Sequence, residues 1–481
     1  MLFNSFDFAI FLPIVFAIYW LIGSRNLKLQ NLFVVAASYL FYGWWDWRFL
    51  SLIIFSTIVD YSVGRGLAVE QNQTKRKGLL WTSLATNLGF LAVFKYYNFF
   101  LENFSSAFSF AGGEIAASSL DIVLPVGISF YTFQTLSYSI DVYKGKLQPT
   151  KDYIAFSAFV SFFPQLVAGP IERASNLLPQ LLSKRVFDYS KAVDGMRQML
   201  WGLFKKIVIA DNCAEYTNLI FNNSADLSGS TLLLGALFFT FQIYCDFSGY
   251  SDIAIGASRL FGINLTQNFA FPFFSRDIAE FWRRWHISLS TWFRDYLYIP
   301  LGGSRGNTWT KVRNVFILFA VSGFWHGANW TFIVWGLLNA LYFLPLLLMK
   351  KNRDNRDVVA AGKILPSISE TLKMFTTFML TALALAVFRA ENLTHAYSYI
   401  INIFSSTLFT IPILPVAFPK GLILGITVFM MLEWYGRERQ YAFSAIVEKL
   451  TKPVRVLVYL VLLFMIYYFA GEQQQFIYFQ F

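Results

Sequence analysis

The chain has 481 residues, of which 56% are hydrophobic and only 14% are charged, and its mean hydropathy is +0.50. A soluble domain carries roughly 25% charged residues, so the composition excludes an ordinary soluble protein. The net charge of +11 would suggest a nucleic-acid partner in a soluble protein. Here Lys and Arg are better explained by cytoplasmic loops of a membrane protein, and we expect no nucleic acid.

Apolar segments that approach the roughly 20 residues of a membrane-spanning helix recur along the chain. In chain order they are residues 8–22, 79–94, 232–244, 331–349, 374–388 and 454–470. Continuous apolar runs favour helices, so we predict an all-α polytopic membrane protein with roughly ten to twelve transmembrane or re-entrant helices. Residues 1–8 contain no basic n-region, so we expect the first helix to be retained. No soluble domain or internal repeat is evident, which predicts one integral-membrane domain over residues 1–481.

Basic residues gather in five stretches, and we predict that all five face the cytoplasm. These stretches are residues 65–77, 184–206, 273–313, 350–363 and 435–455. The last apolar segment then crosses outward and places residues 471–481 at the outer face of the membrane. Residues 264–311 contain no spanning run, and we expect short helices along the cytoplasmic boundary.

His326 lies between two long apolar runs and is flanked by Gly323 and Gly327. An ionisable side chain at membrane depth is costly, and it is usually paired or functional. A helix that enters the membrane about a dozen residues earlier would carry His326 about 18 Å into a hydrocarbon layer about 30 Å thick. We interpret this segment as a broken helix that presents a general base in a cavity or tunnel, with Trp325 and Asn329 as supporting residues.

A second polar cluster surrounds His286. On a helix, His286 would share a face with Arg283, and Glu280 would pair with Arg284. One interpretation is a boundary helix whose arginines reach the lipid headgroups. The other is an anion site in which Arg283 and Arg284 bind the phosphates of a cytosolic donor, with His286 deeper in the membrane.

Asp246 and Asp252 lie in an apolar context. Such carboxylates need partners, because an unpaired buried charge is strongly disfavoured. They could orient a histidine or hold an arginine, so catalytic support and a structural ion pair both stay open. Cys213 and Cys245 show no metal-ligand spacing, and we expect free thiols, no metal and no bound cofactor. The third histidine, His395, is predicted in an outer loop without a role.

The chain ends in an aromatic segment, residues 476–481, after a polar stretch. Chain termini are normally polar and frayed. Interfacial anchoring is sufficient to explain this composition. Alternatively, the segment re-enters a cavity and presents Tyr478 there.

Five motifs together resemble the membrane-bound O-acyltransferase (MBOAT) family, in its bacterial alginate O-acetyltransferase (AlgI-like) branch. They are FQTLSYSIDVY at 133–143, FPQLVAGPI at 163–171, DFSGYSD at 246–252, EFWRRWHISL at 280–289 and GFWHG at 323–327. These motifs cover a core of about residues 130 to 330. The resemblance implies an MBOAT-type helical bundle around a central tunnel in the bacterial inner membrane.

The resemblance also implies roles for individual residues. His326 matches the family's essential histidine, and His286 matches its second, supporting histidine. The donor would be cytosolic acyl-CoA, acetyl-CoA in particular, and the acceptor a cell-envelope polysaccharide. The partner would be a periplasmic or surface transferase of the SGNH hydrolase type. The terminal F-x-Y-x-x-F pattern, residues 476–481, resembles an acyl-carrier motif, in which Tyr478 would carry the acyl group.

The chemistry of this relay is coherent. A phenol with a pKa of about 10 needs a base to attack a thioester at neutral pH, and neutral imidazole is suitable. Two alternatives stay open: direct transfer to a lipid or polymer hydroxyl without Tyr478, and a transporter or flippase, since broken helices with midplane polar residues are also typical of transporters.

Overall fold

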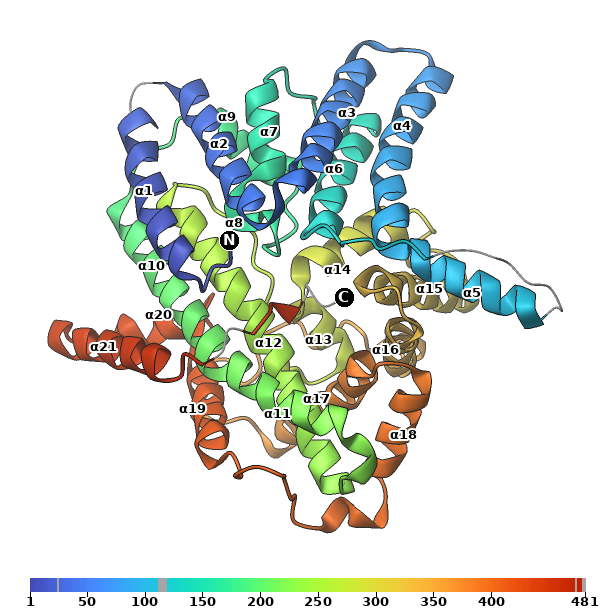
Figure 1. Cartoon of the computed structure of the whole chain (residues 1–481), viewed down its shortest axis with the longest axis vertical. Coiled ribbons are helices and arrows are strands. Elements are labelled where there is room, and N and C mark those ends of the chain that lie inside the picture. The colour runs from blue at the N-terminus through green and yellow to red at the C-terminus, as the bar shows by residue number, and fades with distance from the viewer. Residues whose placement is uncertain (24–25, 111–118, 472–473, 478–481) are drawn as a thin grey trace. The chain divides into compact units, whose positions relative to one another are not determined.

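The computed structural model describes residues 1–23, 26–110, 119–471 and 474–477. Its ordered elements are helices, and no strand occurs within these ranges (Figure 1). This confirms the predicted all-α class. The chain divides into two compact units, Met1–Ala192 with Ala257–Thr266, and Val193–Gly256 with Gln267–Phe481.

The first unit contains nine α-helices, α1 to α9, in its described residues. They are Phe6–Gly23, Leu27–Asp46, Leu50–Val69, Gln73–Leu91, Tyr97–Phe110, Ile128–Tyr143, Tyr153–Ser161, Phe163–Leu166 and Ala174–Leu182. Polar caps set several of the boundaries. For example, the Asn26 side chain accepts hydrogen bonds from the amides of Lys28 and Leu29 at the start of α2, which satisfies donors that a helix leaves free.

Helix α10 (Tyr189–Leu203) begins in the first unit and leads into the second, where it continues as a π-helical segment, η3 (Phe204–Ala210). Helices α11 to α21 follow. They are Asp211–Asn222, Gly229–Leu260, Ile278–Arg284, Ile287–Phe293, Thr308–His326, Trp330–Leu348, Ile368–Arg389, Leu393–Ile403, Lys420–Gly436, Ala442–Val447 and Lys452–Tyr468. The short helices α13 and α14 confirm the short helices predicted within residues 264–311, and their place at the cytoplasmic boundary stays a prediction.

Five helical stretches in the described residues are long and apolar enough to cross a membrane. They are Phe6–Gly23, Leu27–Val69, Gly229–Leu260, Trp330–Leu348 and Ile368–Arg389. Four of the predicted apolar segments fall within them to within one residue, and the stretch formed by α2 and α3 was not among the predicted segments. The predicted segments at 79–94 and 454–470 form helices that are more polar (α4) or shorter (α21).

The motif at 133–143 lies in α6, and four of its polar side chains are buried in the first unit: Gln134, Thr135, Ser137 and Ser139. Asp60 of α3 is fully buried, and it accepts hydrogen bonds from Asn87 at 2.8 Å and from Ser139 at 2.7 Å. The hydroxyl of Thr135 donates to the Asn87 side chain at 3.0 Å. These bonds satisfy a carboxylate that would otherwise be costly to bury.

Candidate active site

The two predicted histidines lie together in the second unit. His326 is the last residue of α15, and His286 lies between α13 and α14. Both side chains are buried, with 4% and 1% exposure, and their ring centroids are 6.5 Å apart. Forty positions in the sequence separate two imidazoles that share one site.

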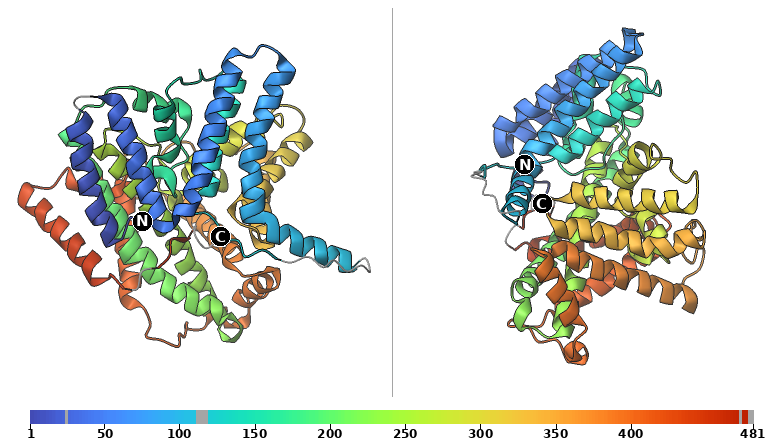
Figure 2. Two further views of the ribbon diagram at one scale, coloured as in Figure 1. Left: turned by 45° about the horizontal axis from the view of Figure 1, so that its top comes forward. Right: turned by 90° about the vertical axis from the view of Figure 1, so that its right-hand side faces the viewer.

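His326 lies at the turn of a helical hairpin. Helix α15 ends there, the chain reverses, and α16 runs back against α15 (Figure 2, right, gold). A Cβ atom on Gly323 would collide with the carbonyl oxygen of Phe332, and one on Gly336 with that of Phe319. The absence of side chains at these glycines therefore permits close packing of the two backbones. The predicted interruption at the glycines is present, but the chain reverses there instead of continuing as one broken helix.

Aromatic rings surround His326. Trp325 lies 5.0 Å from it, Trp335 of α16 lies 5.2 Å away and Phe388 of α17 lies 5.5 Å away, between ring centroids. Trp325 also lies 6.1 Å from His286, so this predicted supporting residue contacts both histidines. Such a wall limits the access of water to the imidazole.

Asn329 has the contacts of a helix cap. Its side chain accepts a hydrogen bond from the amide of Thr331, at the start of α16, and donates one to the carbonyl oxygen of Glu391 at 2.8 Å. It therefore fixes the turn that follows His326.

His286 is held by a residue that the sequence analysis missed. The backbone of His286 is in the left-handed region, with φ of 43°. On its carboxyl side, the Ile287 amide donates to the Asn268 carbonyl oxygen at 2.9 Å, and the Ser288 hydroxyl donates to the Asn268 side chain at 2.6 Å. Asn268 is fully buried and in turn donates to Ser251 at 3.2 Å. No local sequence pattern identifies Asn268, because its partners Ser251, Ile287 and Ser288 are 17 to 20 residues away in the sequence.

Asp246 and Asp252, both on α12, form ion pairs with lysines. Lys206 lies 2.9 Å from Asp246, and Lys205 lies 2.6 Å from Asp252. Both lysines are buried and belong to η3, so they do not contribute to the predicted cytoplasmic basic stretch at 184–206. Two adjacent lysines followed by apolar residues are the sequence signal for this pairing. The partners are lysines, and not the histidine or arginine that the sequence analysis proposes.

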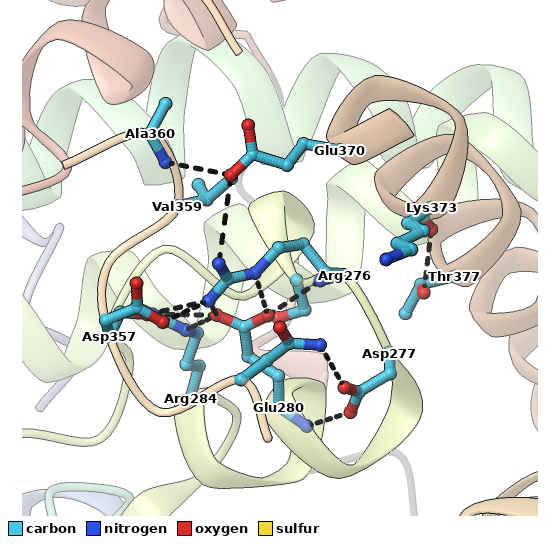
Figure 3. A network of polar contacts seen from close by, with 12 residues as sticks. Arg276, Asp277, Glu280, Arg284, Asp357, Val359, Ala360, Glu370, Lys373 and Thr377 are labelled. Atoms are coloured by element: carbon cyan, nitrogen blue, oxygen red, sulfur yellow. Dashed lines mark hydrogen bonds and ion pairs between the residues drawn. The ribbon is translucent and has the colours of Figure 1, made fainter. Parts of the chain in front are cut away.

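The two predicted donor-binding arginines have different surroundings. Arg284 pairs with Glu280 at 2.9 Å, as the four-residue spacing predicts. It joins a network in which Arg276 binds Glu280 and Asp357 (Figure 3). Hydrogen bonds from Arg276 lower the pKa of Asp357 below its ordinary value. Arg283 instead donates to the carbonyl oxygens of Asn352 and Asn355. The network therefore attaches the loop after α16 to α13.

A cavity of about 540 Å³ lies in the second unit, bordered by α13 to α16. We call it the arginine-lined cavity, because four arginines contribute to its wall: Arg283, Arg294, Arg353 and Arg356. Apolar side chains of α15 and α16, such as Phe319 and Phe343, complete it. Ser322 also lines the cavity, and it lies one helical turn before His326 on α15.

The described end of the chain, residues 474–477, is held in the same unit, and we call it the tail segment. The amide of Ile477 donates to Asp246 at 2.7 Å, and Lys206 donates to the carbonyl oxygen of Gln474 at 3.3 Å. Phe476 is 2% exposed and packs 4.8 Å from the ring of Tyr250. Phe476 and Ile477 of the tail segment are thus buried in the second unit.

Phe476 also connects the tail segment to the histidines. It lies 6.2 Å from Phe247, whose ring contacts His286 edge-to-face at 4.6 Å. Tyr478 follows Ile477 in the sequence, but it lies outside the described residues, so its placement stays a prediction.

Comparison with known proteins identifies the family to which this chain and its two histidines belong. A model of the membrane-bound O-acyltransferase family, MBOAT, matches residues 39–387, and the chain belongs to this family. It is therefore an O-acyltransferase, and the transporter alternative loses its support. The match includes both histidines and the carboxylates of α12.

Several curated relatives are similar over most of the chain. "Probable alginate O-acetylase AlgI" of Pseudomonas aeruginosa is 38% identical over 442 residues, which cover 91% of this chain and 81% of the relative. "Peptidoglycan O-acetyltransferase" of Helicobacter pylori is 36% identical over 82% of this chain and 78% of the relative. "Teichoic acid D-alanyltransferase" of Bacillus subtilis is 31% identical over 45% of this chain and 57% of the relative.

Proposed function

We propose that this protein transfers an acyl group, acetyl in particular, from cytosolic acyl-CoA to hydroxyl groups of a cell-envelope polysaccharide. The observation that carries the proposal is the pair of buried histidines, whose ring centroids are 6.5 Å apart. The unit that contains them also holds the arginine-lined cavity and the tail segment.

The arginine-lined cavity supports acyl-CoA as the donor. Guanidinium groups bind phosphates well because their planar donors match the phosphate oxygens. The apolar walls, including Val315 and Phe319, suit the uncharged arm that carries the thioester. Because Ser322 lines the cavity one turn from His326, a donor bound there would have a short path to the imidazole.

The proposed reaction uses Tyr478 as the first acceptor. His326 takes the phenolic proton while the phenolate oxygen forms a bond to the thioester carbonyl carbon. The tetrahedral intermediate collapses, the carbon–sulfur bond breaks, and the imidazolium returns its proton to the thiolate, which leaves as coenzyme A. Tyr478 then carries the acyl group as a phenolic ester, and attack by a second hydroxyl regenerates the phenol.

The relatives' names support the acceptor class. Two of them refer to alginate and peptidoglycan, which are polysaccharides of the cell envelope. We propose the bacterial inner membrane as the location, with the chain terminus at the outer face. There an SGNH hydrolase-type transferase would accept the acyl group from Tyr478 and pass it to the polymer.

The test is acyl transfer from labelled acetyl-CoA by the protein in proteoliposomes. His326→Ala should reduce labelling of the protein by about 10²- to 10⁴-fold, the usual contribution of a positioned base. His395→Ala is the matched control, and it should label normally. Undiminished labelling of His326→Ala would refute the proposal.

Tyr478→Phe separates the relay from direct transfer. Mass spectrometry of the terminal peptide should find an acyl group on Tyr478 in the wild-type protein and none in the variant. If Tyr478→Phe still acylates a lipid or polymer hydroxyl at the wild-type rate, transfer is direct and the carrier role is wrong.

A further inference from the structure

Buried charges on η3 and α12 meet the tail segment. Lys206 lies 2.7 Å from Asp211 and 2.9 Å from Asp246, so a single positive charge faces two carboxylates and can neutralise only one of them. One buried carboxylate therefore needs additional donors, because burial without them is costly. The amide of Ile477 supplies one such donor to Asp246.

The tail segment contributes main-chain groups to both of the hydrogen bonds that it forms with Asp246 and Lys206. Asp246 accepts from the Ile477 amide, and Lys206 donates to the Gln474 carbonyl oxygen. Main-chain hydrogen bonds fix the register of a docked segment without depending on its side chains. The side chain of Phe476 adds one apolar anchor between Tyr250 and Phe247.

We propose that Lys206 and Asp246 form a tail clamp, a docking site that holds the chain's own C-terminal segment and sets its register relative to His286. The two are positioning residues. This inference rests on the proposed function, because it explains how a carrier at the end of a chain could reach the histidines. Phe476 packs on Phe247, and Phe247 packs on His286, so the position of the tail segment is set relative to His286.

The neighbouring pair offers a matched control. Lys205 and Asp252 are also a buried lysine and carboxylate joining η3 to α12. Within the described residues, however, the Lys205 ammonium bonds to Ser248 and Asp252, and not to the tail segment. Loss of the Lys205 ammonium should cost stability as loss of the Lys206 ammonium does, without releasing the tail.

The experiment measures tail mobility in the full-length protein in nanodiscs. A spin label at Gln475→Cys reports it, because Gln475 is exposed whereas Cys213 and Cys245 are buried. Lys206→Met should shorten the rotational correlation time several-fold, and Lys205→Met should leave it unchanged. Ile477→Pro, which removes the amide donor, should release the tail as well, whereas Ile477→Val should not.

Each result decides the inference. An immobile label in Lys206→Met or Ile477→Pro would overturn the clamp, and so would equal release in Lys205→Met. If Lys206→Met does not fold, the two Ile477 variants decide, because they alter no charge. The mobility measurement does not depend on acyl transfer. A released tail combined with normal transfer by Tyr478→Phe would therefore refute the carrier and leave the clamp standing.

Discussion

At the scale of single residues, the two histidines are held in different ways. His326 is the last residue of α15, and the turn that follows it is held by Asn329, which caps α16. His286 instead occupies a left-handed backbone conformation, which costs about 1–3 kcal/mol for a residue other than glycine. Surrounding bonds must maintain it, and those to Asn268 follow it directly in the chain. Asn268 is therefore a positioning residue for His286.

Replacing Asn268 tests this role. Asn268→Ala leaves the Ser288 hydroxyl without its acceptor, so we expect the turn at His286 to loosen. The kcat of acyl transfer should fall about tenfold, which corresponds to about 1.4 kcal/mol, with little change in KM for the donor. Steady-state kinetics at varied acetyl-CoA concentration measures both.

A matched buried asparagine shows whether instability alone explains the loss. Asn31 of the first unit is buried, and it accepts a hydrogen bond from Arg185 and donates one to Leu181. Asn31→Ala should lower stability but preserve kcat per folded molecule. An equal fall in kcat for both variants would exclude a specific role for Asn268.

At the scale of elements, the hairpin of α15 and α16 depends on glycines at the contact. Two helices approach this closely only where no side chain separates their backbones. Gly323 and Gly336 lie against carbonyl oxygens of the opposite helix. The hairpin thereby sets the position of His326, which ends one of its legs.

Gly323→Ala should separate the two helices. The new methyl group would collide with the carbonyl of Phe332, and overpacking of this kind typically costs about 1–3 kcal/mol. We expect a lower unfolding temperature in detergent and reduced acyl transfer. Gly89→Ala in α4 meets open space, so it should retain or raise the unfolding temperature, since Ala favours helix over Gly. Unchanged stability of Gly323→Ala would contradict the close packing.

At the scale of the whole molecule, every described part of the site belongs to the second unit. The arginine-lined cavity, the histidines and the tail segment all lie within it. The motifs at 133–143 and 163–171 belong to the first unit, where Ser139 donates a hydrogen bond to Asp60 and Gln165 donates one to the carbonyl oxygen of Phe159. Within the second unit, the cavity arginines Arg353 and Arg356 follow α16. The two histidines lie elsewhere, at the end of α15 and between α13 and α14.

This separation predicts a kinetic difference. Replacing Arg353 and Arg356 together with Gln should raise KM for acetyl-CoA about tenfold, which is about 1.4 kcal/mol of binding, and leave kcat nearly unchanged. Phosphate contacts remote from the reacting carbonyl act equally on ground and transition states. Arg439→Gln, which loses only a surface pair with Glu448, is the control. A fall in kcat without a change in KM would place the donor elsewhere.

The sequence by itself determined the class of the protein and the residue types of its chemistry. Apolar runs near 20 residues specify membrane helices wherever they occur in a fold, because the bilayer thickness sets their length. The i,i+4 pair of Glu280 and Arg284 was also predictable, because helix geometry makes such residues neighbours.

Only the tertiary structure decided which distant residues meet. It brought His286 to His326, gave lysines from η3 to the carboxylates of α12, and placed the tail segment on Asp246. These contacts join segments 40 to more than 200 residues apart. Sequence spacing fixes neighbours only within a few helical turns, whereas long-range contacts depend on how the helices pack against one another.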